Sequence, residues 1–451
     1  MLGAVQTPHF SQAQLQQRNY ALFSLIRALE SAAWILILLF YSGAVVGLSV
    51  ADVASLESGE AGGFARSLWY ITYVIVLALG VFRLPNIIQL ATFNPILIIC
   101  VLWCGLTYFW SYDPSLTMRR TIALTMTTFA GLAFAARYDW GEAVVRIAIA
   151  MLILCIVTYI ATLANPARGI MQEIHAGAWR GPWVEKNQLG GIMSKGVAAT
   201  LCAFAMQPKR GIIWIPAITL CLSLVLLSTS KTSLLVSLGC ISLFIMIRVF
   251  RRFPFLRLPV LFFLFLSISS FWGFIKFFPD QAFGLIGKDA TLTGRTDIWT
   301  LLIEAISKEP MLGYGYGVFW MDPLGPSYHV RQALQWPVPT AHNGWFDAWL
   351  SGGFVVIALF SLLAIITLIA GIRRLWSGGV EAYWVILSLF FFFGFSMSES
   401  TILQQNDLSW FLFVVTASKL WARERAWWRP ETLRLRHALK LQQLRSAQNQ
   451  I

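Results

Sequence analysis

His342 stands where a polar stretch gives way to a long apolar one, in the sequence PTAHNGWFDAWLSGG (residues 339–353). Asn343 follows it directly, and Asp347 lies one helical turn further on. A neutral imidazole has an ordinary pKa of about 6.5, so it is the side chain best suited to take a proton from a hydroxyl at neutral pH. The alternative is a structural histidine that bonds the free N–H groups at the start of its helix. The sequence leaves both roles open.

Basic residues supply the second chemical signal. A guanidinium group matches the oxygens of a diphosphate with a fork of donors and stays charged at any relevant pH, so Arg180 and Arg295 are the strongest candidates for holding such an anion. The further candidates are Arg119, Arg120, Lys186 and Lys231. Snorkelling or a local ion pair would explain any one of them alone, but the group as a whole favours an anion site.

Acidic residues and histidines show no convincing pattern for a divalent metal ion on the same side of the chain. We therefore expect neither a metal nor another cofactor, although scattered acids such as Asp289 and Asp297 leave a metal role open. All six cysteines fall inside apolar segments, where they are expected to act as small packing residues.

The chain that positions these residues is far too apolar for a soluble protein. Of its 451 residues, 57% are hydrophobic and 12% are charged, against about half and a quarter in soluble domains. Apolar runs close to the ~20 residues that cross a bilayer recur along almost its whole length, which predicts an all-α integral membrane protein with about twelve transmembrane helices. The predicted spans are 32–50, 68–82, 95–110, 121–136, 143–161, 188–206, 212–227, 232–247, 259–277, 348–371, 382–396 and 408–421.

Charge counting orients these spans, because Lys and Arg concentrate in cytoplasmic loops. Both termini are then cytoplasmic, with an N-terminal segment 1–31 that lacks a secretory signal, a membrane domain 32–421 and a basic tail 422–451 on the inner membrane surface. The candidate site residues all fall on the external side. The net charge of +13 therefore reflects topology and attraction to anionic lipids, and no motif for nucleic acid accompanies it.

Two external loops, 162–187 and 278–347, interrupt the membrane domain, and the second is long enough to cover the membrane face as a partly helical cap. Within it we predict a helix that begins with Thr296 as N-cap and ends before Pro310. Its apolar stripe consists of Ile298, Leu302, Ala305 and Ile306. Arg295 would be held just before this helix, and GYGYG (313–317) predicts a turn with its tyrosines at the membrane interface.

Five motifs, in this order, resemble those of the O-antigen ligase and O-antigen polymerase family. They are WRGPWVEKNQLGG (179–191), STSKTSLL (228–235), TGRTDIW (293–299), PMLGYGYGVFW (310–320) and AHNGWFDAWLSGG (341–353). With SYDPSLTMRR (111–120) the resemblance covers about residues 110–400, and it looks closest to the exopolysaccharide-polymerase members. Each motif alone is weak, but five in order with the expected topology are specific.

Members of that family take a glycan from an undecaprenyl-diphosphate carrier at the outer face of the bacterial inner membrane and join it to an acceptor sugar. The resemblance implies that the active site faces the periplasm, that Arg180 and Arg295 hold the diphosphate, and that His342 activates the acceptor. Asn187, Asn343 and Asp347 would support the site. Two residues depart from the family pattern: Lys231 stands where arginine is commoner, and Glu185 where histidine is often seen.

The resulting hypothesis is a metal-independent membrane glycosyltransferase that polymerises exopolysaccharide or O-antigen repeat units. Alternatives are a ligase that joins the glycan to lipid A core, a protein glycosylation enzyme, and a lipid or polysaccharide transporter, against which the gathering of charges at one membrane face counts. A structural scaffold would leave the external cations unexplained. Membrane lipids and polysaccharide assembly proteins are expected as further partners, whereas the sequence does not identify the acceptor.

Overall fold

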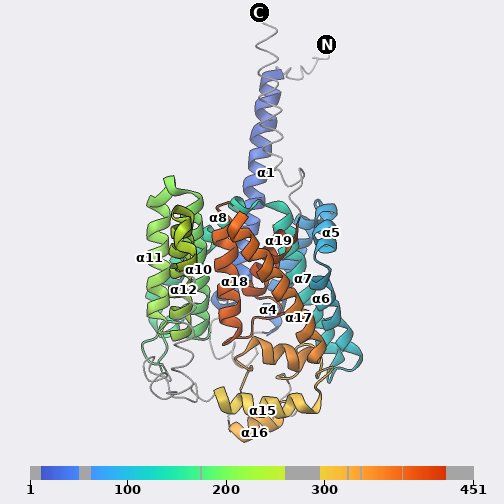
Figure 1. Cartoon of the computed structure of the whole chain (residues 1–451). Helices are drawn as coiled ribbons and strands as arrows, with labels where there is room; N and C mark the ends of the chain where they lie inside the picture. The colour runs from blue at the N-terminus through green and yellow to red at the C-terminus, as the bar shows by residue number, and fades with distance from the viewer. Residues whose placement is uncertain are drawn as a thin grey trace, which may run out of the picture.

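The structure is a computed structural model of the whole chain, and it describes residues 12–49, 62–172, 175–259, 295–321, 325–335, 338–377 and 379–422. Within these ranges the regular elements are helices, apart from one isolated antiparallel bridge between Ile170 and Trp179. The helices lie side by side in a bundle with α15 and α16 beneath its lower end (Figure 1). This confirms the prediction of an all-helical, multi-pass membrane protein.

The chain order of the elements is as follows. The first half contains α1 (Gln12–Tyr41), α2 (Ala44–Ser49), α4 (Gly62–Val81), α5 (Leu84–Phe93), α6 (Pro95–Leu106), α7 (Pro114–Arg137), α8 (Trp140–Ala164) and α9 (Pro166–Gly169). The second half contains α10 (Lys186–Met206), α11 (Gly211–Leu227), α12 (Lys231–Arg252), α15 (Arg295–Lys308), α16 (Tyr328–Leu334), α17 (Gly344–Ser377), α18 (Ala382–Ser396) and α19 (Leu408–Trp421). Short 3₁₀ turns lie at Thr107–Phe109, Pro208–Arg210 and Pro254–Leu256.

Six helices among the described residues are long and apolar enough to cross a membrane, and a seventh span results if α4 and α5, bent by 93°, count as one. Three further apolar helices, at Pro95–Phe109, Ala382–Ser396 and Leu408–Trp421, are shorter. Every predicted span overlaps a helix except 259–277, which lies outside the described residues beyond residue 259. The first span differs in extent, because α1 ends at Tyr41 and residues 12–31 continue the same helix.

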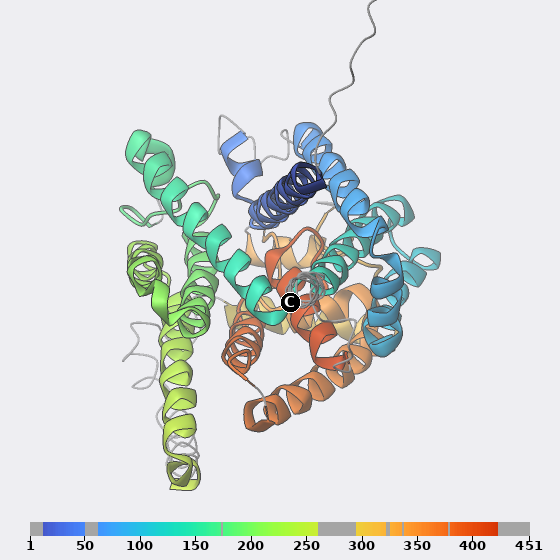
Figure 2. The ribbon, with the colours of Figure 1, turned by 90° about the horizontal axis from the view of Figure 1, so that it is seen from above.

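The bundle is held together by helices that are buried on nearly all sides. α10 packs against α8, α11, α12 and α18, and α19 packs against α7, so the C-terminal helices lie among those of the first half (Figure 2). Small residues allow the helices to pack this closely. At Gly190 of α10, for example, an added Cβ would lie only 2.6 Å from the Ser233 hydroxyl of α12, so a larger residue would not fit there. All six cysteines are buried, which confirms their interpretation as packing residues.

The cap built from α15 and α16 largely follows the sequence prediction. The stripe Ile298, Leu302, Ala305 and Ile306 is buried in a small apolar cluster with Phe319 and Val338. Thr296, however, lies inside α15 instead of capping it, since the helix already includes Arg295. Tyr316 in the predicted turn is buried: it is 4% exposed, and its hydroxyl donates to the Leu403 carbonyl at 2.6 Å.

A break at Gly353 divides α17 into two parts. Gly353 has a φ of 68° and a ψ of −165° inside the helix, and a Cβ there would lie 2.1 Å from the Met311 carbonyl oxygen. The Phe354 N–H donates to the Pro310 carbonyl at 2.8 Å, and the Tyr314 N–H to the Leu350 carbonyl at 2.8 Å. The predicted span 348–371 falls within Gly344–Trp376, which is long and apolar enough to cross a membrane, but the sequence did not predict the break at Gly353. The segment before the break runs across the lower end of the bundle, and the segment after it runs along the bundle (Figure 1).

Candidate active site

His342 lies in the turn that leads into α17. Its φ is 47°, in the left-handed region that few non-glycine residues adopt but in which histidine is enriched. Its N–H donates to the Thr340 hydroxyl at 3.3 Å. The helix is capped by its neighbour: the Asn343 side-chain oxygen accepts from the N–H groups of Trp345 at 2.9 Å and Phe346 at 3.4 Å. The capping role considered for His342 therefore belongs to Asn343, and the imidazole is left for other contacts.

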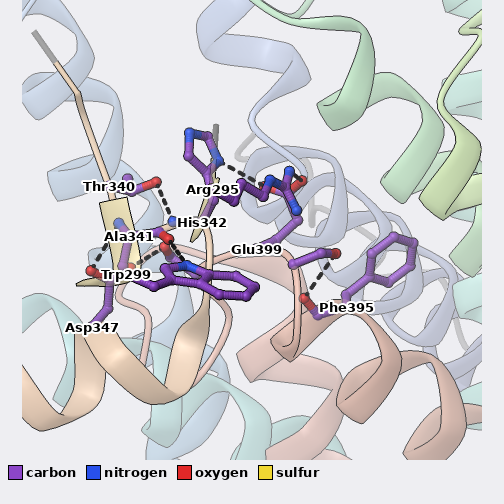
Figure 3. A network of polar contacts seen from close by, with 10 residues as sticks. Arg295, Trp299, Thr340, Ala341, His342, Asp347, Phe395 and Glu399 are labelled. Carbon is purple, nitrogen blue, oxygen red and sulfur yellow. Dashed lines mark hydrogen bonds and ion pairs between the residues drawn. The ribbon is translucent and has the colours of Figure 1, made fainter. Parts of the chain in front are cut away.

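Two further side chains fix this turn. Asp347 is half-buried and accepts from the Trp320 indole at 2.8 Å, from the Ala341 N–H at 3.2 Å and from the Ser400 hydroxyl. The Trp299 indole of α15 donates to the Ala341 carbonyl at 3.0 Å (Figure 3). Asp347, predicted as a supporting residue, thus ties the turn to its surroundings, and the backbone beside His342 is held from both sides.

Arg295 and His342 both lie near one carboxylate, that of Glu399 (Figure 3). The Arg295 Nη2 lies 3.8 Å from Oε1, and the His342 Nδ1 lies 4.0 Å from Oε2. The Glu399 N–H donates to the Phe395 carbonyl at 2.7 Å. Sequence reasoning missed Glu399, although a signal exists: it is one of two acids in SMSESTILQQND (396–407), a polar break between two apolar helices.

The pKa values of this group are shifted in opposite directions. Burial, together with the positive charge of Arg295, lowers the pKa of His342 to about 4. Burial raises the pKa of Glu399 to about 7, where the cations Arg295 and Lys195 lower it and the acid Glu185 raises it. At neutral pH the imidazole is therefore uncharged, the state in which it can accept a proton.

Lys186 and Lys231 form a second group at the same end of the bundle. They begin α10 and α12, and the charge of each acts on the other. The Lys186 ammonium donates to the Thr229 hydroxyl at 3.3 Å, and burial together with Lys186 lowers the pKa of His175. Asn187 lies half-buried in the first turn of α10. Glu185, the N-cap of α10, connects the two groups because its charge acts on Glu399.

Of the other predicted arginines, Arg180 and Arg120 contact backbone. The Arg180 guanidinium donates to the Arg168 carbonyl at 2.8 Å and to the Val184 carbonyl at 3.5 Å, so it sits just before the start of α10. Arg120 donates to the Gly317 carbonyl at 2.5 Å and Arg119 is exposed on α7. In the part of the chain that the structure describes, Arg180, Arg119 and Arg120 form no ion pair or hydrogen bond with His342 or Arg295.

A cavity of about 200 Å³ lies behind the turn. Its lining includes Arg120, Tyr316, Trp320, Thr340, Asp347 and Ser400. Arg295, His342 and Glu399 do not line it, so their shared site is a separate feature. In the part of the chain that the structure describes, no group of three or more histidine, cysteine or carboxylate side chains is arranged to hold a metal ion.

Comparison with known proteins agrees with the motifs. Residues 216–361 match a family model described as O-antigen ligase, a range that contains Lys231, Arg295 and His342 but stops before Glu399. The Exopolysaccharide production protein ExoQ of Rhizobium meliloti (strain 1021) is 27% identical over 257 residues, which cover 53% of this chain. The match spans only 58% of that relative's length. These findings confirm the resemblance to the O-antigen ligase and polymerase family.

Proposed function

We propose that this protein, whose middle segment matches the O-antigen ligase family, is a membrane glycosyltransferase that takes its glycan from an undecaprenyl-diphosphate carrier. It joins the glycan to an acceptor sugar and so polymerises exopolysaccharide or O-antigen repeat units. One observation carries the proposal: Arg295 and His342, from separate elements, converge on Glu399. An anion-binding group and a neutral base thus lie side by side.

The donor side of the reaction rests on cations. Arg295 at the start of α15 would grip the diphosphate with its fork of donors. Lys186, Lys231 and Arg180 would add charge from the starts of α10 and α12 and from the loop before α10, and Asn187 would add a polar contact. One positioned donor contributes about 3 kcal/mol to stabilising developing charge, so this term is the largest in the mechanism.

The acceptor side rests on His342. Its imidazole removes the proton from the acceptor hydroxyl while that oxygen forms a bond to the anomeric carbon of the donor sugar. The bond between the anomeric carbon and the diphosphate oxygen breaks, and its electron pair leaves with the diphosphate. A single displacement of this kind inverts the anomeric carbon, and base catalysis contributes about a hundredfold or more.

The orientation follows from how charge is distributed between the two ends of the bundle. Arg83, Arg137 and Arg374, which the sequence assigns to the cytoplasm, form ion pairs with Glu30 and Glu381. Arg295 and His342 lie at the end covered by α15. We place that end in the periplasm and both termini in the cytoplasm of a bacterial inner-membrane protein with about twelve spans. Gathering of the charged groups at one end argues against a transporter, whose ionisable groups lie near the midplane.

The acceptor distinguishes two candidate activities. The name of the relative, an exopolysaccharide production protein, favours a polymerase that extends a growing saccharide. The description of the family model, O-antigen ligase, favours transfer to lipid A core. A polymerase gives a ladder of products, whereas a ligase gives a single addition for each acceptor.

Reconstitution tests the proposal. Purified protein in liposomes receives an undecaprenyl-diphosphate-linked glycan together with either a saccharide primer or lipid A core, and the products are separated by size. We expect a ladder on the primer, and its loss in His342→Gln, because an amide preserves a hydrogen-bond partner but takes no proton. His329→Gln, the same change in α16 of the cap, serves as the control. Full transfer by His342→Gln would contradict the base assignment, and absence of transfer by the unaltered protein to either acceptor would contradict the function.

A further inference from the structure

We infer that Glu399 is a positioning residue for His342: one carboxylate oxygen accepts the Nδ1–H of the imidazole, which directs Nε2 toward the acceptor, while the other oxygen is held by Arg295. This inference rests on the proposed function, because it assigns the orientation of the proposed base. It concerns a residue beyond the segment 216–361 that matches the family model.

The geometry places Glu399 on the Nδ1 side of His342. Among the residues that the structure describes, the buried Nδ1 has no hydrogen-bond partner, and the Glu399 Oε2 lies 4.0 Å away. A movement of about 1 Å would bring the two atoms within the range of an N–H···O bond. The turn around His342 is held by Thr340 and by the Trp299 contact to Ala341, so the movement belongs to Glu399.

The carboxylate decides which imidazole nitrogen carries the proton. A neutral imidazole has one N–H and one lone pair, and a carboxylate accepts but does not donate. A carboxylate beside Nδ1 therefore keeps the proton there and leaves the lone pair on Nε2. As Nε2 takes the proton of the acceptor, the imidazolium that forms lies next to a negative charge, which stabilises it.

The charges around Glu399 connect this base to the donor. Arg295 from α15, Lys195 from within α10, Glu185 at the start of α10 and His342 all face Glu399. The Lys195 ammonium lies 4.7 Å above the Phe395 ring and donates to the Gly191 carbonyl at 3.2 Å. Arg295 lowers the pKa of both His342 and Glu399, so a diphosphate that neutralises Arg295 raises both pKa values.

The test compares Glu399→Gln with the unaltered protein across a range of pH in the liposome assay. The amide has nearly the same shape but no charge, so kcat should fall about a hundredfold, while KM for the donor changes little. Because the pKa of Glu399 is raised to about 7, activity of the unaltered protein should fall as pH drops through about 7. In Glu399→Gln this decline should move to lower pH, toward the pKa of His342. Glu304→Gln, an exposed position on α15, is the matched control.

The outcomes separate the inference from the function. One outcome would overturn the positioning role and leave the function intact. In it, transfer requires His342, but Glu399→Gln changes neither kcat nor the pH at which activity falls on the acid side of the profile. Absence of transfer by the unaltered protein would instead overturn the function. Should Glu399→Gln fail to fold, Glu399→Asp decides: its shorter carboxylate should lower kcat yet keep the acid limb, and an unchanged kcat would overturn the inference.

Discussion

Two carboxylates in this molecule each lie between two basic groups, and they differ in how closely they are paired. At the end of the bundle opposite the cap, Glu30 meets Arg83 at 2.9 Å and Arg137 at 2.8 Å, and its side chain is 11% exposed. At the capped end, Glu399 faces Arg295 at 3.8 Å and His342 at 4.0 Å, and is 33% exposed. The first arrangement is closed and joins helices. The second leaves its basic groups incompletely paired and open to a ligand.

The largest expected effect breaks the open arrangement. Arg295→Ala should lower glycan transfer by about 100- to 1000-fold, because it removes a principal donor to the departing diphosphate. Arg295→Lys should also lose most activity, since an ammonium keeps the charge but not the two-pronged geometry. Initial rates in liposomes measure both, with insertion checked by monodispersity in detergent. Near-normal rates in Arg295→Ala would count against a diphosphate role.

Breaking the closed arrangement should affect stability instead. Glu30→Ala leaves Arg83 and Arg137 without their shared carboxylate, which should cost about 3 kcal/mol. Thermal unfolding in detergent should reveal the loss, while the rate per folded molecule stays close to normal. A strong drop in that rate with unchanged stability would contradict the view that Glu30 contributes to stability and Glu399 to transfer.

Lys186 and Lys231 sharpen the comparison by testing how far the open site extends. Each change to Ala should lower transfer by roughly tenfold, as a supporting charge rather than a principal donor. If either lysine and Arg295 hold the same diphosphate, the double variant should lose less than the two single losses combined. Fully additive losses would place the lysines in a different site.

The pH dependence should be a smaller effect, and it should be confined to the open site. The pKa of Glu399 is raised to about 7, so its carboxylate is present above that pH and lost below it. Transfer should therefore fall several-fold between pH 8 and pH 6. His342, whose pKa is lowered to about 4, stays uncharged across this window. A flat profile would mean that the Glu399 charge does not contribute.

Labelling should distinguish the two ends without altering activity. Gln332 on the cap and Lys209 in the turn between α10 and α11 are both exposed. A cysteine at position 332 should react with an impermeant thiol reagent once the outer membrane is permeabilised, and one at position 209 only after the inner membrane is opened. The six natural cysteines are buried, which keeps the background low. The reverse pattern would invert the orientation and with it the mechanism.

Local pattern predicted a good part of this architecture. The apolar runs located the helices, and the spacing of Ile298, Leu302, Ala305 and Ile306 predicted the buried face of α15. Periodicity reports which face of a helix is buried, and that information is present in the sequence of the element alone. The candidate residues Arg295 and His342 were also recognisable by type and motif, and the structure brings them to one carboxylate.

The features that were missed depend on contacts between distant segments. Glu399 lies in a short polar break, and nothing in its own neighbours indicates that it meets residue 342. The break at Gly353 likewise results from the close approach of the 310–312 backbone, which the apolar run across that position conceals. Its charge alone makes Arg120 a candidate for binding the diphosphate. Its contact to the Gly317 carbonyl depends instead on how the segment around residue 317 packs against α7.

The break at Gly353 also affects how far the position of His342 depends on the thickness of the membrane. The part of α17 that carries the turn at His342 is joined to the cap through Pro310 and Leu350, so the height of the imidazole is set at this joint. The part that follows can tilt to match a thicker or thinner hydrocarbon layer, at a fraction of a kcal/mol for each ångström of mismatch. We expect such an adjustment to be absorbed at the far end of the helix, so that the position of the imidazole relative to the cap changes little with lipid composition.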